Sequence, residues 1–222
     1  DDTEPRSAAG RLAARCWALL LARIYENRNF EPAWPAVERM DELIRLVEST
    51  ADDGFDPADY HLEALNRVRA RLAAGERFDT AEQAALDIGM TDSLIRIGYH
   101  RRFGKVNPND LDPDWNFERE LRRRDPAIVF QEAMDADTLA GYLERTFPRD
   151  ELYRRMQGYL AQYRDLAASG GWPQIPDGPT IRPGDGDPRL PAARRGDADR
   201  QRLDPGRDGA SRKVRDDRGA AY

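Results

Sequence analysis

Apolar residues recur along most of this chain at intervals of three and four positions, the period of a helix with one buried face. The pattern is clearest at Val37, Met40, Ile44 and Val47, which are separated largely by charged residues. The same spacing recurs in three further segments, 62–72, 86–97 and 152–166. We therefore predict an all-α fold, a compact multi-helix scaffold.

Capping residues and helix breakers set the expected boundaries. Asp56 followed by Pro57 is a favourable helix start, and Thr80 with Gln83 has the spacing of a capping box. Runs of β-branched residues leave room for at most a short strand at residues 179–182. The predicted helices cover residues 8–26, 37–48, 57–75, 80–103, 118–124, 126–134, 138–147 and 148–169.

Three loops rich in proline, glycine and aspartate separate these helices, at residues 52–61, 103–116 and 170–176. Gly104 suits the left-handed position after a helix end, and Pro108 prevents the helix from continuing. A tryptophan beside proline can fix such a loop by packing, or could instead stack on a sugar. We predict that seven residues act as structural loop anchors: Trp34, Trp115, Trp172, Gly104, Pro108, Asp56 and Pro57.

Read in order, these loops resemble the non-catalytic scaffold domain of the large murein L,D-transpeptidases of the YcbB type, enzymes that cross-link the cell wall. The resemblance covers roughly residues 15–190. Four segments carry it: YENRNFEPAW at 25–34, DDGFDPADYHL at 52–62, FGKVNPNDLDPDWN at 103–116 and YRDLAASGGWPQIPDGPTIRPGDGDPRL at 163–190.

The resemblance implies a scaffold domain over residues 1–170 and a linker over 171–190. The family continues into a peptidoglycan-binding module, but residues 191–222 contain few large apolar residues and many Arg and Asp residues. We expect there a disordered basic tail, or the degenerate start of that module. The implied partners are the catalytic and peptidoglycan-binding modules of the parent protein, and further peptidoglycan or cell-wall proteins. The resemblance alone implies a periplasmic location, since the chain itself contains no signal peptide that would indicate one.

The family's catalytic motif, Ser-His-Gly-Cys, is absent from this sequence. The one cysteine, Cys16, precedes an apolar run, which would raise the pKa of a thiol and make it a poor nucleophile. His61 has no nucleophile in a local motif, so a hydrogen-bonded packing role is favoured over a general base. We predict no enzyme activity and no catalytic, cofactor-binding or metal-binding residues.

Charged residues could support other functions. Clustered aspartates at 52–59 and 185–187 could bind a cation, but turns also recruit aspartate. The pair Arg101-Arg102 and the run 122–124 could bind an anion, although solvation and the helix dipole also explain them. The net charge of -6 argues against a nucleic-acid partner. The longest apolar run is too short for a transmembrane segment.

Three functions remain open at this stage. The resemblance favours a scaffold domain that positions transferase and glycan-binding modules during peptidoglycan cross-linking. The alternative is an independent helical adaptor whose ordered loops bind a protein. An unrecognised enzyme that uses carboxylates is the weakest, since no paired set occurs in a common motif.

Overall fold

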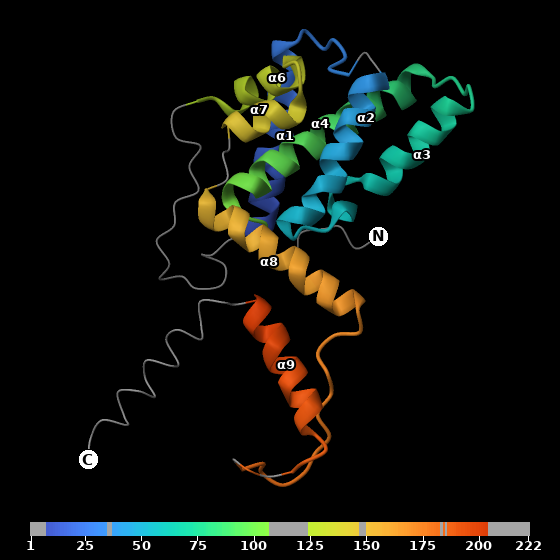
Figure 1. Cartoon of the computed structure of the whole chain (residues 1–222). Helices are drawn as coiled ribbons and strands as arrows, with labels where there is room; N and C mark the ends of the chain where they lie inside the picture. The colour runs from blue at the N-terminus through green and yellow to red at the C-terminus, as the bar shows by residue number, and fades with distance from the viewer. Residues whose placement is uncertain are drawn as a thin grey trace. The chain divides into compact units, whose positions relative to one another are not determined.

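The computed structural model describes residues 8–34, 37–106, 124–146, 150–182, 184 and 186–203. These residues form α-helices and two short 3-10 helices and contain no strand, so the predicted all-α class is confirmed (Figure 1). The elements are α1 (Ala8–Asn27), α2 (Val37–Glu48), η1 (Ser49–Asp53), η2 (Pro57–Tyr60), α3 (Leu62–Ala73), α4 (Thr80–Phe103), α6 (Pro126–Asp135), α7 (Leu139–Thr146), α8 (Glu151–Ala168) and α9 (Leu190–Leu203).

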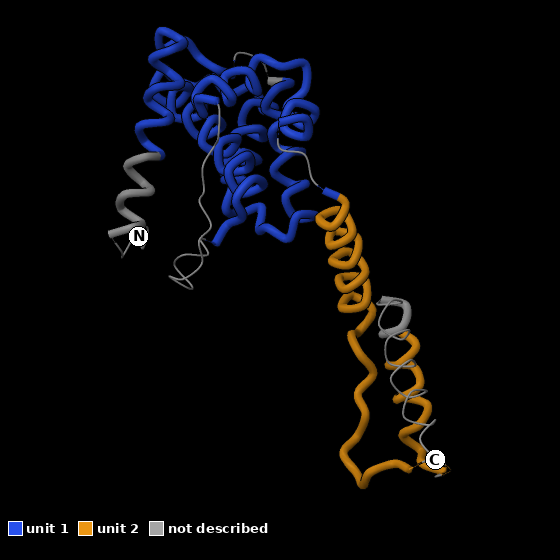
Figure 2. Tube along the Cα trace, turned by 90° about the vertical axis from the view of Figure 1, so that its left-hand side faces the viewer, with its two compact units in different colours: residues 1–150 blue, residues 151–222 orange. Residues whose placement is uncertain are grey.

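The chain divides into two compact units, Asp1–Asp150 and Glu151–Tyr222 (Figure 2). Unit 1 contains the helices α1 to α7, and unit 2 contains α8 and α9. The sequence predicted domain boundaries after residues 170 and 190, which differ from this division after Asp150. Those two domain boundaries stay predictions.

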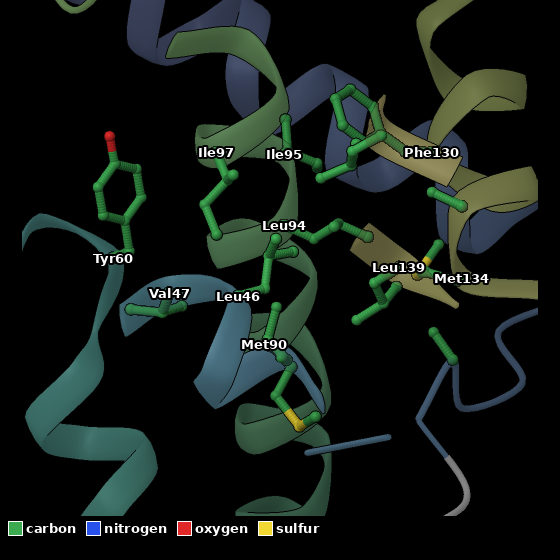
Figure 3. Packing of buried hydrophobic residues seen from close by; sticks show 14 of the residues in the cluster. Leu46, Val47, Tyr60, Met90, Leu94, Ile95, Ile97, Phe130, Met134 and Leu139 are labelled. Atoms are coloured by element: carbon green, nitrogen blue, oxygen red, sulfur yellow. The ribbon is translucent and has the colours of Figure 1, made fainter. Parts of the chain in front are cut away.

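Helix α4 is the centre of unit 1. Helices α1 and α2 both contact it, and α3 lies against α2 (Figure 1). Helix α6 lies against α1, and α7 lies against α2. Figure 3 shows Leu94 and Ile97 of α4 among residues from both sides, with Val47 and Tyr60 on one side and Phe130 on the other. The apolar surface of α4 is therefore broader than the single stripe read from the sequence.

Helix α4 has the predicted bounds, but its N-terminal capping box lies one residue earlier than predicted. The backbone N–H of Glu82 donates to Asp79 Oδ1 at 2.8 Å, and the N–H of Asp79 donates to Glu82 Oε2 at 3.0 Å. This reciprocal pair is the capping box, so the assignment to Thr80 and Gln83 is wrong. Both pairs have the required spacing, but the Asp79 carboxylate accepts the cap bond and Gln83 instead donates to the carbonyl of Phe78 at 2.8 Å.

The predicted helix at 57–75 is interrupted at His61, whose backbone has a φ of 62°. That left-handed residue separates the 3-10 turn η2 from α3. Asp56 caps η2, since its carboxylate accepts from the N–H of Ala58 at 3.0 Å, and Pro57 is the first residue of the turn.

Helix α9 occupies residues 190–203, where the sequence predicted the start of a disordered tail. Ala192, Ala193, Arg194 and Arg195 have high helix propensity, which the argument from missing apolar residues did not weigh. Residues 204–222 lie outside the described part of the chain, as does almost all of the helix predicted at 118–124. Residues 179–182 do not form the short strand that the sequence left open.

Candidate functional site

Helix α4 carries four buried polar residues, Asp87, Thr91, Asp92 and Ser93. Asp87 accepts three hydrogen bonds, from the Tyr25 hydroxyl at 2.6 Å and from the backbone N–H groups of Ala33 and Trp34 at 3.0 Å each. One buried carboxylate thus ties the end of α1 and the following turn to the central helix. Burial, and then the adjacent Asp87 carboxylate, raise the pKa of Tyr25, which keeps its hydroxyl protonated as a donor.

Thr91 extends this cluster by one helical turn. Its hydroxyl lies 2.8 Å from the Tyr25 hydroxyl and accepts the indole N–H of Trp34 at 2.9 Å. Trp34 also packs against the hydrophobic core of unit 1. The structure therefore places this predicted loop anchor at a partly buried position, where its backbone N–H and its indole N–H are both hydrogen-bonded.

Asp92 is the second buried carboxylate. It accepts from His61 Nε2 at 2.7 Å and Arg96 Nε at 2.6 Å, and also from the Trp17 indole N–H. Burial alone would raise its pKa, but the bonds from His61, Arg96 and Trp17 outweigh it and lower the pKa of Asp92 to about 2. Asp92 is therefore ionised at neutral pH, and both of its oxygens are occupied.

The two histidines have hydrogen-bonding partners of different kinds. His61 pairs with Asp92, and His100 Nδ1 lies 2.9 Å from the Tyr60 hydroxyl. The His100 ring also packs against Phe55, with ring centroids 5.9 Å apart. His100 is therefore held by ring packing and a hydrogen bond, whereas the His61 side chain is 43% exposed and is held by its bond to Asp92.

A buried ion pair joins the end of α4 to η1. Arg101 Nε lies 2.8 Å from Asp53 Oδ2, and their side chains are only 7% and 0% exposed. Arg101 is therefore committed inside the fold and cannot serve the anion site considered for Arg101-Arg102. Asp59 pairs with Lys105, and no cluster suited to a metal ion occurs among the described residues.

The remaining predicted anchors are distributed across the chain. Gly104 ends α4 with a φ of 76°, and its N–H donates to the carbonyl of His100 at 2.8 Å. Trp172 belongs to unit 2 and is 39% exposed. Trp115 and Pro108 lie outside the described residues, so a tryptophan sugar platform stays a hypothesis.

An open groove of about 1000 Å³ lies on unit 1 beside the Asp87 cluster. Its apolar lining comes from α1, the turn after it, α2, the end of α3 and the first half of α4. The principal lining residues are Leu21, Tyr25, Phe30, Trp34, Met40, Leu72, Phe78, Leu86, Ile88 and Met90. A groove of this size and lining suits an apolar ligand or peptide better than a polar substrate.

Comparison with known families identifies this architecture. The family model of the Scaffold domain matches residues 19–160, which include the buried polar residues of α4 and the whole groove. This chain belongs to the Scaffold domain family. No curated protein and no solved structure gives a significant match.

The match ends within α8, so the family region includes the first part of unit 2. Within the described portion of this Scaffold domain protein, no helix is long and apolar enough to cross a membrane.

The sequence analysis did not single out Asp87, Thr91 or Asp92. The available signal was that Thr91 and Asp92 follow Asp87 by four and five positions, inside a helix that also carries a strong apolar stripe. Such polar residues are normally assigned to the solvent face. Apart from Arg96, which is four positions from Asp92, the side chains that bond to them lie 31 to 75 positions away, beyond any local pattern.

Proposed function

We propose that this chain is the non-catalytic scaffold domain of a murein L,D-transpeptidase that cross-links peptidoglycan in the periplasm. The observation that carries the proposal is the Scaffold domain match over residues 19–160. The loop segments 52–62, 103–116 and 163–190 support it, because they resemble the scaffold of that enzyme family. In this role the chain positions the transferase and glycan-binding modules of the parent protein.

The arrangement of polar residues supports a holding role. Asp87 and Asp92 use their oxygens to attach the turn after α1 and residues 17 and 61 to one central helix. Hydrogen bonds of this kind fix relative positions, which is the property a scaffold needs. His61 and Asp92 could form an acid–base pair, but the other Asp92 contacts, Trp17 and Arg96, are not nucleophiles.

The proposal is tested by mixing the purified chain with disaccharide tetrapeptides and following amide exchange by mass spectrometry. We expect no exchange and no acyl adduct on Cys16. The second arm adds the Ser-His-Gly-Cys domain encoded at the same locus, joined to this chain or alone, and exchange is expected to be faster with the chain present. Exchange by the chain alone, abolished in Cys16→Ser, would refute the non-catalytic role. A locus without such a domain would refute the transpeptidase parent.

The independent adaptor is the second candidate, and the apolar groove is the observation that favours it. An adaptor would bind its partner with unchanged affinity when every transpeptidase module is absent. Binding that requires those modules would favour the scaffold instead.

A further inference from the structure

The floor of the groove is made by two helices that run side by side. Helix α1 contributes Leu21, Ala22 and Tyr25, and α4 contributes Thr80, Gln83, Ala84, Leu86, Asp87, Ile88 and Met90. Among the α4 residues, Thr80, Ala84 and Ile88 follow one another at steps of four. Ala22 and Ala84 are exposed and small, so a third helix can approach the floor closely. Ridges of this spacing are the surfaces on which helices pack, at interaxial distances of about 8–10 Å.

One wall of the groove is the turn that follows α1. Asn29 and Phe30 both have left-handed backbones, with φ of 53° and 60°, and Phe30 is 74% exposed. The N–H of Phe30 donates to the carbonyl of Tyr25 at 2.8 Å, and Arg28 pairs with Asp135 at 3.1 Å. A strained, tightly held turn thus presents a large aromatic side chain to solvent, and packing within unit 1 does not explain it.

The corner between α3 and α4 also lines the groove. Arg71 pairs with Glu76 at 2.6 Å and with Glu82 at 3.1 Å, and its guanidinium lies 4.4 Å from the centroid of the Phe78 ring. Glu82 is also bonded to Asp79 in the capping box. These four charged residues therefore bind one another and fix the corner.

Arg77 lies in this corner but takes no part in its network. Three charged residues line the groove, and the other two are committed, Glu76 to Arg71 and Asp87 to Tyr25 and two backbone N–H groups. Arg77 is exposed and forms no ion pair or side-chain hydrogen bond with any residue that the structure describes. The groove therefore combines an apolar floor with one available positive charge at its edge.

We propose that this groove binds an amphipathic helix of a partner protein, whose apolar stripe lies on α1 and α4 and whose Asp or Glu beside that stripe pairs with Arg77. The helical ridges of the floor favour a helix over an extended segment, and the uncommitted cation selects for a carboxylate. Phe30 and Ile88, which is 47% exposed, would be covered by the bound helix. The inference adds a binding site to the proposed scaffold role and holds whether or not the parent is a transpeptidase.

The test selects peptides from a displayed library on the full purified chain. The library has helical peptides with leucine at positions i, i+3, i+4 and i+7 and with all flanking positions randomised. We expect recovered peptides to carry Asp or Glu beside the leucine stripe, and their affinities are measured by fluorescence anisotropy. Failure to recover binding peptides would overturn the proposal, as would displacement of bound peptide by a long-chain fatty acid at lower concentration than by unlabelled peptide.

Two pairs of variants localise the binding. Ala84→Trp fills the floor and should weaken binding by at least about tenfold, a change typical of a blocked central contact. Ala85→Trp, exposed on the same helix but outside the groove, is the control and should bind as wild type. Thermal melting verifies that both fold. Equal affinities for the two variants would place the peptide elsewhere and refute the proposal.

The charge is tested in the same way. Arg77→Glu should weaken the acidic peptide roughly three- to fivefold, the size expected for an exposed ion pair turned repulsive. A peptide with Lys in place of the acidic residue should bind this variant better than it binds wild type. Arg67→Glu, on exposed α3 surface outside the groove, should change neither affinity. Identical effects of Arg77→Glu and Arg67→Glu would show general electrostatics and refute the assigned contact.

Discussion

The two units use similar helical patterns for different purposes. In unit 1 the apolar stripes of α2 and α4 meet in one buried cluster that includes Leu43 and Leu94, both 0% exposed. In α8 of unit 2 the stripe is largely uncovered, since Leu152, Met156 and Tyr163 are 65%, 61% and 50% exposed. Periodicity predicts a helix in both cases, but it does not tell whether the apolar face has a partner.

The largest expected effect compares a leucine of the buried α4 stripe with a leucine of the exposed α8 stripe. Leu94→Ala should lower the free energy of unfolding by about 3 kcal/mol, because it leaves a cavity in a fully packed site. Leu152→Ala, the matched change in unit 2, should stay within about 0.5 kcal/mol. Urea titration followed by circular dichroism measures both. Similar losses for the two variants would mean that the stripe of α8 is covered in solution.

A smaller effect tests the polar anchoring of unit 1 through its dependence on pH. The pKa of Asp92 is lowered to about 2 from its ordinary value of 3.8, so its ionised form stabilises the fold above pH 4. That contribution, roughly 2 kcal/mol from a shift of this size, is lost as the pH falls from about 4 to about 2. Asp92→Asn should be less stable at neutral pH and should lack this part of the acid response.

The control for that experiment comes from unit 2. Asp187 pairs with Arg189, two residues along the chain, at 2.7 Å. A pair between residues this close in the sequence can persist in the unfolded chain. Asp187→Asn should therefore change the acid response of unfolding much less than Asp92→Asn. Unfolding curves at pH 2, 3, 4 and 7 decide the comparison. Parallel curves for wild type and Asp92→Asn would contradict the role of this carboxylate.

The smallest expected effect concerns the exposed face of α8. Met156→Gln replaces an exposed side chain by a polar one with similar helix propensity, so stability should change by no more than about 0.5 kcal/mol. Thermal melting of the full chain measures the difference. A loss above about 1 kcal/mol would show that another surface buries this stripe.

The sequence predicted the helices well because each one depends on local spacing. The stripe at Leu86, Met90, Leu94 and Ile97 placed α4, and all four residues are buried or partly buried. The details of its ends were harder to predict, because Asp79–Glu82 and Thr80–Gln83 have the same spacing and only the structure shows which pair bonds.

The candidate site was largely beyond sequence reasoning. The groove joins residues from the ranges 21–34, 72–78 and 80–90 with Met40, and its position depends on how α1, α2, α3 and α4 pack together. Arg77 and Arg71 look equivalent in the sequence, yet only Arg71 has partners among the described residues. Side-chain geometry decides which of the two arginines can pair with a ligand, and no local sequence pattern predicts that geometry.

The two buried carboxylates of α4 also restrict how that helix can turn about its own axis. A slip of one residue rotates a helix by about 100° and would take Asp87 and Asp92 away from their donors. Each buried carboxylate left unsatisfied costs at least about 1 to 3 kcal/mol, whereas leucine and isoleucine side chains could repack after such a slip at lower cost. The central helix therefore has a single rotational setting, and every molecule presents the same row of residues to whatever lies above Ala84.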